Sequence, residues 1–353
     1  MLIGDNEEAI KGKNELSLEN DIEHAAKSFM DIFNNVKSEI QKVIVGYDEI
    51  IAQALIAFIA GGHVLLEGVP GLGKTLLVRT LADVVKQKFS RIQFTPDLMP
   101  ADITGTNIVM EEESGRRYFE FQKGPVFGNI ILADEINRAT PRTQSALLEA
   151  MQEGTVTVAG KNYELPKPFF VLATQNPIEM EGTYPLPEAQ LDRFFFKLNV
   201  ESPELSPLVE IFKRTTQAVE TSAKSIIEGK EIIKMNKFAR QVPIANALVD
   251  YAARIIKATA PESDESKKVE VVKKNVRYGA SPRGGQAIIL ASKVRALVKG
   301  RLNVSADDIR AMSFPALRHR IILNFEGEAK GITRDDIISD ILSNVPELKK
   351  ELR

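Results

Sequence analysis

The apolar residues of this chain follow two kinds of pattern. Over 21–43 they recur every three or four positions, which predicts an amphipathic helix, and Val45-Gly46 separates it from a second helix to about Ala60. Elsewhere they form short continuous runs, which are typical of strands buried on both faces of a sheet. Strands are predicted at 63–67, 91–95, 129–134, 169–173 and 194–198, and helices between them to about residue 88 and over 141–152. This alternation predicts an α/β fold, with a parallel sheet between layers of helices.

Two stretches interrupt the alternation with strand-like patterns of their own. Polar and apolar residues alternate over 102–123 around Ser114-Gly115, and again over 155–165 around a turn at 159–161. Both patterns predict β-hairpins. We therefore expect an αβα sheet domain that carries two hairpin inserts.

The composition changes after Leu198. Pro203 and Pro207 indicate a linker, and the remaining sequence shows helical periodicity only. Ser305 followed by Asp308 predicts a capped helix start, and the charged run 262–268 predicts a solvated loop. The predicted organisation is a mobile tail over 1–20, an α/β domain over 21–204 and a small helical domain over 205–353.

Composition and charge exclude several kinds of function. The 353 residues include no cysteine, which excludes disulfides, thiol catalysis and thiolate metal sites. Three histidines without metal-ligand spacing argue against a histidine metal centre. A net charge of −2 without a long basic run argues against electrostatically driven, non-specific nucleic-acid binding as the main task, and leaves a local basic patch open.

No segment of the sequence predicts a membrane anchor. Residues 1–20 are polar and acidic and lack the apolar core of a signal peptide. The longest apolar stretch, 50–66, is broken by Gln53 and by Gly61-Gly62-His63, so it predicts a helix, a turn and a buried strand. We expect a cytoplasmic protein without a membrane span.

The most informative motif is the octapeptide Gly68-Val69-Pro70-Gly71-Leu72-Gly73-Lys74-Thr75, between a predicted strand and a predicted helix. In that context the pattern is typical of a loop that cradles the phosphates of a nucleotide. The glycines allow backbone N–H groups to turn toward an anion, and the start of the helix adds its positive dipole end. We expect Lys74 to reach the β- and γ-phosphates and the Thr75 hydroxyl to join the shell of a Mg²⁺ ion.

An acid pair, Asp134-Glu135, ends the predicted strand 129–134. Parallel sheets bind their ligands at the carboxyl ends of the strands, so this pair is expected beside the phosphate loop. Asp134 would hold Mg²⁺ through water, and Glu135 would orient or deprotonate the water that attacks the γ-phosphate. The alternative, an acidic cap for the next helix, is disfavoured by the phosphate loop on a neighbouring strand.

Three further polar residues are candidates for the same chemistry. Asn176 follows the strand 169–173, and its uncharged amide can bind the attacking water and a phosphate oxygen; turn formation by Asn176-Pro177 is the alternative. Arg193 can neutralise charge on the γ-phosphate, also in a neighbouring subunit, or form a salt bridge to Asp192 or Glu188. Arg283, at the start of a predicted helix, can reach the nucleotide from the helical domain.

Together these motifs resemble those of the AAA+ ATPases, and specifically of the MoxR family, over about 43–323. The most specific strings are 133–139, 144–153, 173–179 and 182–194. The resemblance implies that Asp134 and Glu135 occupy the Walker B position, Asn176 sensor 1, Arg193 the arginine finger and Arg283 sensor 2. The hairpins would be the helix-2 and pre-sensor-1 inserts of this branch. Gly284-Gly285 depart from the pattern, because a better helix former would fix Arg283 more firmly.

The resemblance also implies a function. MoxR relatives are hexameric ring ATPases with chaperone-like roles, whose partners often carry von Willebrand A domains and use metal ions, and magnesium chelatase subunits are cousins. It implies Mg²⁺-dependent ATP hydrolysis by a self-associated ring that remodels or activates a client protein. The segment 262–274 and the tail are additions to the family pattern.

A DNA translocase or helicase is the rival function. Related rings grip nucleic acid with the pre-sensor-1 hairpin, and Lys161 lies at its predicted tip. That lysine is a lone charge near Glu164, without the basic groove or stacking aromatics that such binding favours, so a nucleic-acid partner is disfavoured. A GTPase is disfavoured because the sequence lacks the Asn-Lys-x-Asp string that reads guanine. A small-molecule kinase is disfavoured because it would not need the arginine finger, the second sensor or the hairpins.

Overall fold

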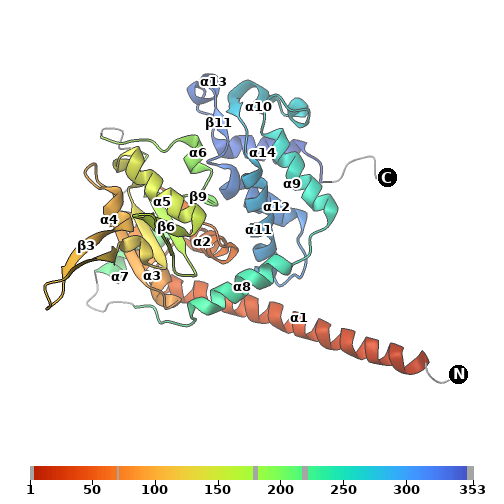
Figure 1. The fold of residues 1–353 in the computed structure, drawn as a ribbon. Helices are drawn as coiled ribbons and strands as arrows, with labels where there is room; N and C mark the ends of the chain where they lie inside the picture. Colours follow the sequence, from red (N-terminus) through yellow and green to blue (C-terminus); the bar gives the residue numbers. More distant parts are fainter. Residues whose placement is uncertain (1–3, 70, 178–181, 217–221, 348–353) are drawn as a thin grey trace.

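The computed structural model describes residues 4–69, 71–177, 182–216 and 222–347, with side chains from residue 22 onward. A five-stranded parallel sheet lies beside a group of helices (Figure 1). The order of its strands is β2 (Phe89–Gln93), β5 (Ile130–Asp134), β8 (Phe170–Gln175), β1 (Val64–Glu67) and β9 (Phe196–Asn199). The predicted α/β fold class is therefore confirmed.

The interior strands β5, β8 and β1 are apolar along most of their length because both faces of the sheet are covered there. Val64 and Leu66 of β1 belong to one hydrophobic core with helices α2 (Asp48–Ala60) and α3 (Lys74–Val84). Leu65, which points to the opposite face, belongs to a second core with α5 (Pro141–Glu153). Burial of successive residues in two cores is the reason that these strands read as unbroken apolar runs.

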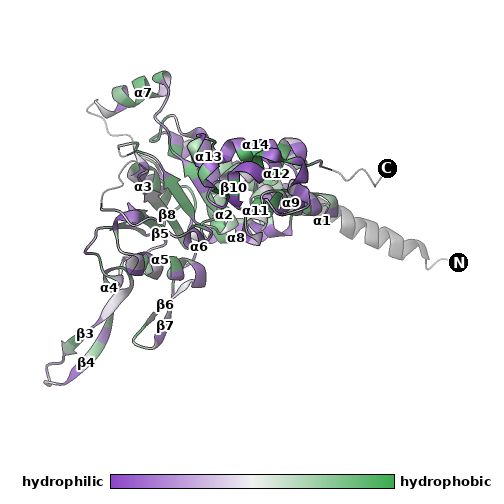
Figure 2. Ribbon diagram, turned by 90° about the horizontal axis from the view of Figure 1, so that it is seen from above, coloured by the Kyte–Doolittle hydropathy of each residue, from purple (hydrophilic) through white to green (hydrophobic). Residues whose placement is uncertain are grey.

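Both predicted hairpins are present. The first follows the short helix α4 (Pro100–Thr104) and pairs β3 (Gly105–Glu111) with β4 (Arg117–Lys123), and the second pairs β6 (Thr155–Val158) with β7 (Lys161–Glu164). They extend from the same side of the sheet (Figure 2). The rings of Phe121 and Tyr163 stack with their centroids 4.2 Å apart and join the two hairpins.

The first helix differs from its prediction. Helix α1 runs from Gly4 to Gln41, so the segment 1–20, which we expected to be a tail, is helical from Gly4 onward. Residues 4–20 contain no proline, and several of them are glutamate, lysine or leucine, which favour helices.

The C-terminal part is mostly helical, as its periodicity predicted. Its helices are α7 (Leu205–Thr215), α8 (Gly229–Gln241), α9 (Asn246–Ala258), α10 (Glu270–Asn275), α11 (Pro282–Val298), α12 (Ala306–Leu317), α13 (Phe325–Ala329) and α14 (Arg334–Asn344). The expectation of helices alone was wrong, because β10 (Val276–Tyr278) pairs with β11 (Ile322–Leu323). These strands are too short to show a period.

Two local predictions in this part have different outcomes. The capped start of α12 is confirmed, since the backbone N–H of Ser305 donates to Asp308 Oδ2 at 2.9 Å. The charged run 262–268 is not simply a solvated loop, because it includes the short 3₁₀ helix η3 (Glu265–Lys268) and the buried Ser266.

The helical part and the sheet share a hydrophobic core. Helix α11 contacts α1 and α2, and one apolar cluster runs from the strands through these helices to α14. The division into domains at 21–204 and 205–353 stays a prediction.

Candidate active site

The phosphate loop connects β1 to α3 and takes a conformation that needs glycine. Gly71 and Gly73 have φ values of 85° and 72°, in the left-handed region, and Gly73 is the N-cap of α3. Gly68 has a different reason, since a Cβ there would lie 2.3 Å from the carbonyl oxygen of Val200. Pro70 lies outside the described residues.

A polar pocket of about 360 Å³ lies in front of this loop, and we call it the phosphate pocket. It brings together the loop, the acid pair and the residue after β8, as the sequence predicted for the carboxyl edge of a parallel sheet. Its lining residues are Gly71, Gly73, Lys74, Thr75, Leu76, Arg91, Asp134, Glu135, Thr174 and Asn176.

Lys74 is the cationic group of the phosphate loop. Its Nζ donates to the carbonyl oxygen of Gly68 at 2.5 Å. Partial burial lowers the pKa of the Lys74 ammonium from its usual value, while the charges of Asp134 and Glu135 oppose that shift. The nearby carboxylates thus favour the charged form, which can bind an anion.

Asp134 is held in place by two side chains that the sequence analysis did not single out. The Thr174 hydroxyl donates to Asp134 Oδ1 at 2.6 Å, and Arg91 Nη2 lies 2.7 Å from Asp134 Oδ2. The register of the parallel strands brings them together, because Ala133 pairs with Ala173 and Gln93 with Asp134. The position of Thr174 near the carboxyl end of an interior strand could have singled it out from the sequence. Arg91, in the middle of the edge strand β2, gave no such signal, and only the register of the strands brings both side chains to Asp134.

Glu135 has an unusual backbone. Its φ and ψ are 56° and 50°, a left-handed conformation that is rare outside glycine and costs about 1–3 kcal/mol. Its backbone N–H donates to the Thr174 hydroxyl at 2.8 Å, which supports this turn. Its carboxylate accepts from Gln93 Nε2 at 3.0 Å and from Arg138 Nη1 at 2.9 Å. The strained backbone of Glu135 thus places its carboxylate at the edge of the phosphate pocket.

Thr75, Asp134 and Asn176 complete the polar lining. Asn176 is buried and directly follows β8. The Thr75 hydroxyl and the Asp134 carboxylate are oxygen donors on one pocket, which is the ligand type that Mg²⁺ takes along with phosphates and waters. Among the described residues no group of three or more His, Cys, Asp or Glu could hold a separate metal ion.

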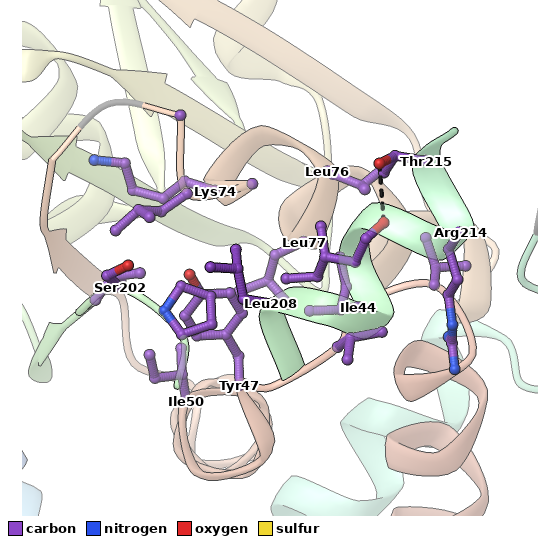
Figure 3. Close-up of a pocket in the computed structure, with 18 of the residues that line it drawn as sticks. Ile44, Tyr47, Ile50, Lys74, Leu76, Leu77, Ser202, Leu208, Arg214 and Thr215 are labelled. Atoms are coloured by element: carbon purple, nitrogen blue, oxygen red, sulfur yellow. Dashed lines mark hydrogen bonds between the residues drawn. The ribbon is translucent and has the colours of Figure 1, made fainter. Parts of the chain in front are cut away.

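An apolar pocket of about 340 Å³ adjoins the phosphate pocket (Figure 3). The two share Gly71, Gly73, Lys74 and Leu76. Its walls come from the segment 43–50, from α3 and from α7, including Ile44, Tyr47, Ile50, Leu77, Val200, Leu208, Ile211 and Phe212. An apolar space beside a phosphate pocket matches the two ends of a nucleotide, a planar base and a charged tail. The sequence did not predict it.

Arg193 lies away from the phosphate pocket of its own chain. It follows helix α6 (Glu188–Leu191), and its Nη1 donates to the carbonyl oxygen of Leu148 on α5 at 3.0 Å. None of the ion pairs between described residues involves Arg193, so the alternative of a salt bridge to Asp192 or Glu188 is not observed.

Arg283 also does not line the phosphate pocket. It lies in the first turn of α11, and its Nη1 is 3.6 Å from Asp192 Oδ2. Asp192 is the residue that directly precedes Arg193. The two glycines that follow Arg283 have a packing reason, because a Cβ at Gly284 would lie 3.1 Å from side-chain atoms of Arg320 and Leu317. The expected reach of Arg283 into its own nucleotide site is therefore not seen in this structure.

The parallel sheet, the phosphate loop and the acid pair at its edge define a P-loop protein of the AAA+ ATPase class. The family described as "ATPase family associated with various cellular activities (AAA)" matches residues 63–196, and the AAA lid domain matches residues 269–341. The chain belongs to the MoxR family of AAA+ ATPases. It is 45% identical over 307 residues to Chaperone MoxR1 of Mycobacterium tuberculosis, covering 87% of this chain and 80% of that protein.

Other relatives agree. Protein MoxR of Methylorubrum extorquens is 30% identical, over 88% of this chain and 92% of that protein. The crystal structure of a putative ATPase from Cytophaga hutchinsonii has a TM-score of 0.86 and 40% identity, covering 95% of this chain and 99% of that chain. In the described part of the chain no helix is long and apolar enough to cross a membrane.

Thr174→Val should lower the rate of ATP hydrolysis about 10-fold and leave ATP binding nearly unchanged. The substitution removes the hydroxyl that holds both Asp134 and the backbone of Glu135, and small displacements of catalytic groups are costly. Thr174→Ser keeps the hydroxyl and serves as the control. Steady-state kinetics with ATP check this, and equal rates for Val and Ser would contradict it.

Proposed function

We propose that this chain hydrolyses ATP with Mg²⁺ in a ring, as expected a hexamer, and uses the reaction to remodel or activate a partner protein. The observation that carries the proposal is that Lys74, Asp134 and Asn176 line one pocket, which adjoins an apolar space. A nucleotide triphosphate has this combination of shape and charge. Mg²⁺ on Thr75 and Asp134 would neutralise charge on the phosphate oxygens.

The roles of the protein groups follow from their positions. Lys74 and the N–H groups at the start of α3 bind the phosphates, and the apolar pocket takes the adenine. Glu135 orients and deprotonates the attacking water, while Gln93 and Arg138 both donate to its Oε2. The Asn176 amide holds the water and a phosphate oxygen in line.

The site is incomplete without a second subunit. Arg193 directly follows Asp192, Arg283 lies near the Asp192 carboxylate, and neither arginine lines the phosphate pocket of its own chain. We infer that both serve the nucleotide of the neighbouring subunit, where an arginine can stabilise charge on the transferred phosphoryl group. Hydrolysis would then change the contact between subunits, which is how the ring would deliver motion to a client.

The client is proposed from the family. The relative Chaperone MoxR1 is named as a chaperone. The partner that we propose for this chain is a von Willebrand A-domain protein. A pull-down with Glu135→Gln should retain clients in the presence of ATP, because this variant binds ATP without hydrolysing it. Lys74→Ala is the control without bound nucleotide. Equal recovery with both variants, despite confirmed ATP binding to the first, would contradict remodelling.

DNA-dependent translocation remains the alternative function. Its supporting feature is Lys161, which is exposed at the start of β7 in the second hairpin. The neighbouring aromatic Tyr163 stacks on Phe121 instead of presenting its face to solvent. Stimulation of the ATPase by single-stranded DNA, lost on Lys161→Ala, would favour this alternative over the proposed one.

A further inference from the structure

The loop that carries Arg193 is held by residues of the helical part. This loop, residues 192–195, connects α6 to β9, and we call it the finger loop. His319 and Arg320, which follow α12, both contact the carbonyl oxygen of Phe194: His319 Nε2 at 2.9 Å and Arg320 Nη2 at 2.7 Å. Because a carbonyl oxygen only accepts, Nε2 of His319 carries the proton. Two segments 125 residues apart in sequence are thus joined at one backbone oxygen.

Arg320 uses all of its hydrogen-bond donors. A guanidinium has five N–H groups, and here each has an acceptor. Nε donates to Asp192 Oδ1 at 2.7 Å, Nη2 to the Asp192 carbonyl oxygen at 3.0 Å and to that of Phe194, and Nη1 to the carbonyl oxygens of Phe195 (3.2 Å) and Ala316. Four of these five acceptors belong to the finger loop.

Asp192 joins this contact to the start of α11. The Ser281 hydroxyl lies 2.9 Å from both of its carboxylate oxygens, and Arg283 lies near one of them. Ser281 is the N-cap of α11, so the helix that carries Arg283 is fixed to the same carboxylate. The Asp192 carboxylate is therefore shared by Arg283 and the buried Arg320, and Asp192 directly precedes Arg193 in the finger loop.

The burial of this ion pair indicates a role beyond packing. The side chain of Arg320 is 3% exposed and that of Asp192 is 19% exposed. Burial lowers the pKa of the Arg320 guanidinium from its usual value, and the hydrogen bond and charge of Asp192 counteract it. Buried ion pairs are often no more stabilising than an apolar replacement, so we infer that this pair serves to fix the geometry of the finger loop.

We propose that Arg320 is a positioning residue for Arg193. Through Asp192 and the carbonyl oxygens of the finger loop it fixes the loop to α12, so that a movement of the helical part moves the finger presented to the neighbour. The proposal rests on the proposed function, in which Arg193 acts on ATP in the next subunit. Arg320 cannot take that role itself, because it is buried and its donors are all in use.

Arg320→Lys tests this, because lysine keeps the charge but cannot reproduce a planar five-donor fork. We expect kcat to fall about 10- to 100-fold, with the KM for ATP changed less than twofold, because the nucleotide site itself is intact. The matched control is Arg318→Lys. The Nε and Nη2 of Arg318 bind the Asp335 carboxylate, both at 2.7 Å, entirely within the helical part.

Mixed assemblies separate positioning from a general loss of stability. Lys74→Ala subunits keep a working finger but bind no ATP. Arg193→Ala subunits bind ATP but lack the finger. Arg320→Lys should regain activity when mixed with Lys74→Ala and gain none when mixed with Arg193→Ala, as expected of a subunit that lacks only its finger. Arg318→Lys should show nearly full activity alone.

The outcomes are distinct. No recovery when Lys74→Ala is mixed with Arg193→Ala would overturn the action of the finger between subunits, and this proposal with it. If that reference mixture recovers activity, two results would overturn the positioning role alone. One is an unchanged kcat for Arg320→Lys, and the other is equal activity of Arg320→Lys in its mixtures with Lys74→Ala and with Arg193→Ala. If Arg320→Lys fails to fold by circular dichroism, Asp192→Asn, which removes the charge from the more exposed partner, decides by the same mixtures.

Discussion

Glu135→Gln is expected to lower kcat for ATP hydrolysis by about 10²- to 10⁴-fold while ATP stays bound, the range that a positioned general base contributes. The substitution keeps the size of the side chain and its ability to accept from Gln93 and Arg138, but removes the base. The phosphate loop and the apolar pocket are untouched, so the affinity for ATP should change little. Single-turnover kinetics and equilibrium binding of a fluorescent ATP analogue measure the two quantities.

The control for this variant is the same change at a remote position. The control is Glu270→Gln. Glu270 is exposed on α10, and among the described residues its carboxylate forms an ion pair with Lys274. Glu270→Gln should leave kcat unchanged. If Glu135→Gln hydrolysed ATP at the rate of this control, the chain would not be an ATPase that uses Glu135, and a scaffold that binds nucleotide would explain the site better.

Arg193→Ala is expected to reduce ATP hydrolysis by about 10³- to 10⁵-fold in a uniform assembly, the range for arginine fingers. Because Arg193 lies outside the phosphate pocket of its own chain, the loss should be repairable by another subunit. Mixed with Lys74→Ala, which is also inactive alone, it should recover activity at about one interface in four of a random equal mixture. Titrating the ratio of the two variants under steady-state conditions measures this.

A surface arginine outside these contacts is the matched control. Arg116, in the exposed turn of the first hairpin, has no assigned role, and Arg116→Ala should behave like the unmodified chain. Absence of recovery at every mixing ratio, with both variants folded and assembled by light scattering, would show that Arg193 does not act between subunits.

The two predictions address different halves of one site. Glu135 depends on contacts within its own chain, to Thr174, Gln93 and Arg138. Arg193 depends on a loop that the helical part holds through Arg320. In the proposed function, the chemistry and its coupling to motion would therefore be carried by separate sets of residues, which can be changed independently.

Much of the site could be predicted because its signals are local. The phosphate loop is one contiguous octapeptide in which Gly71 and Gly73 take left-handed conformations, and the acid pair ends an apolar strand. The rule that parallel strands bind ligands at their carboxyl ends was enough to bring Lys74, Asp134 and Asn176 to one pocket. The predicted start of the first helix at residue 21 was wrong, because the polar composition of the preceding segment was given more weight than its helix propensity.

The sequence by itself determined the fold class, the hairpins, and the phosphate loop, acid pair and Asn176 of the phosphate pocket, since period, turn chemistry and strand ends act over a few neighbouring residues. Only the tertiary structure decided that Thr174 and Arg91 hold Asp134, that α7 closes an apolar pocket, and that Asp192 joins Arg283 to Arg320. These contacts link segments far apart in the chain. They depend on strand register and helix packing, which no local pattern of residues specifies.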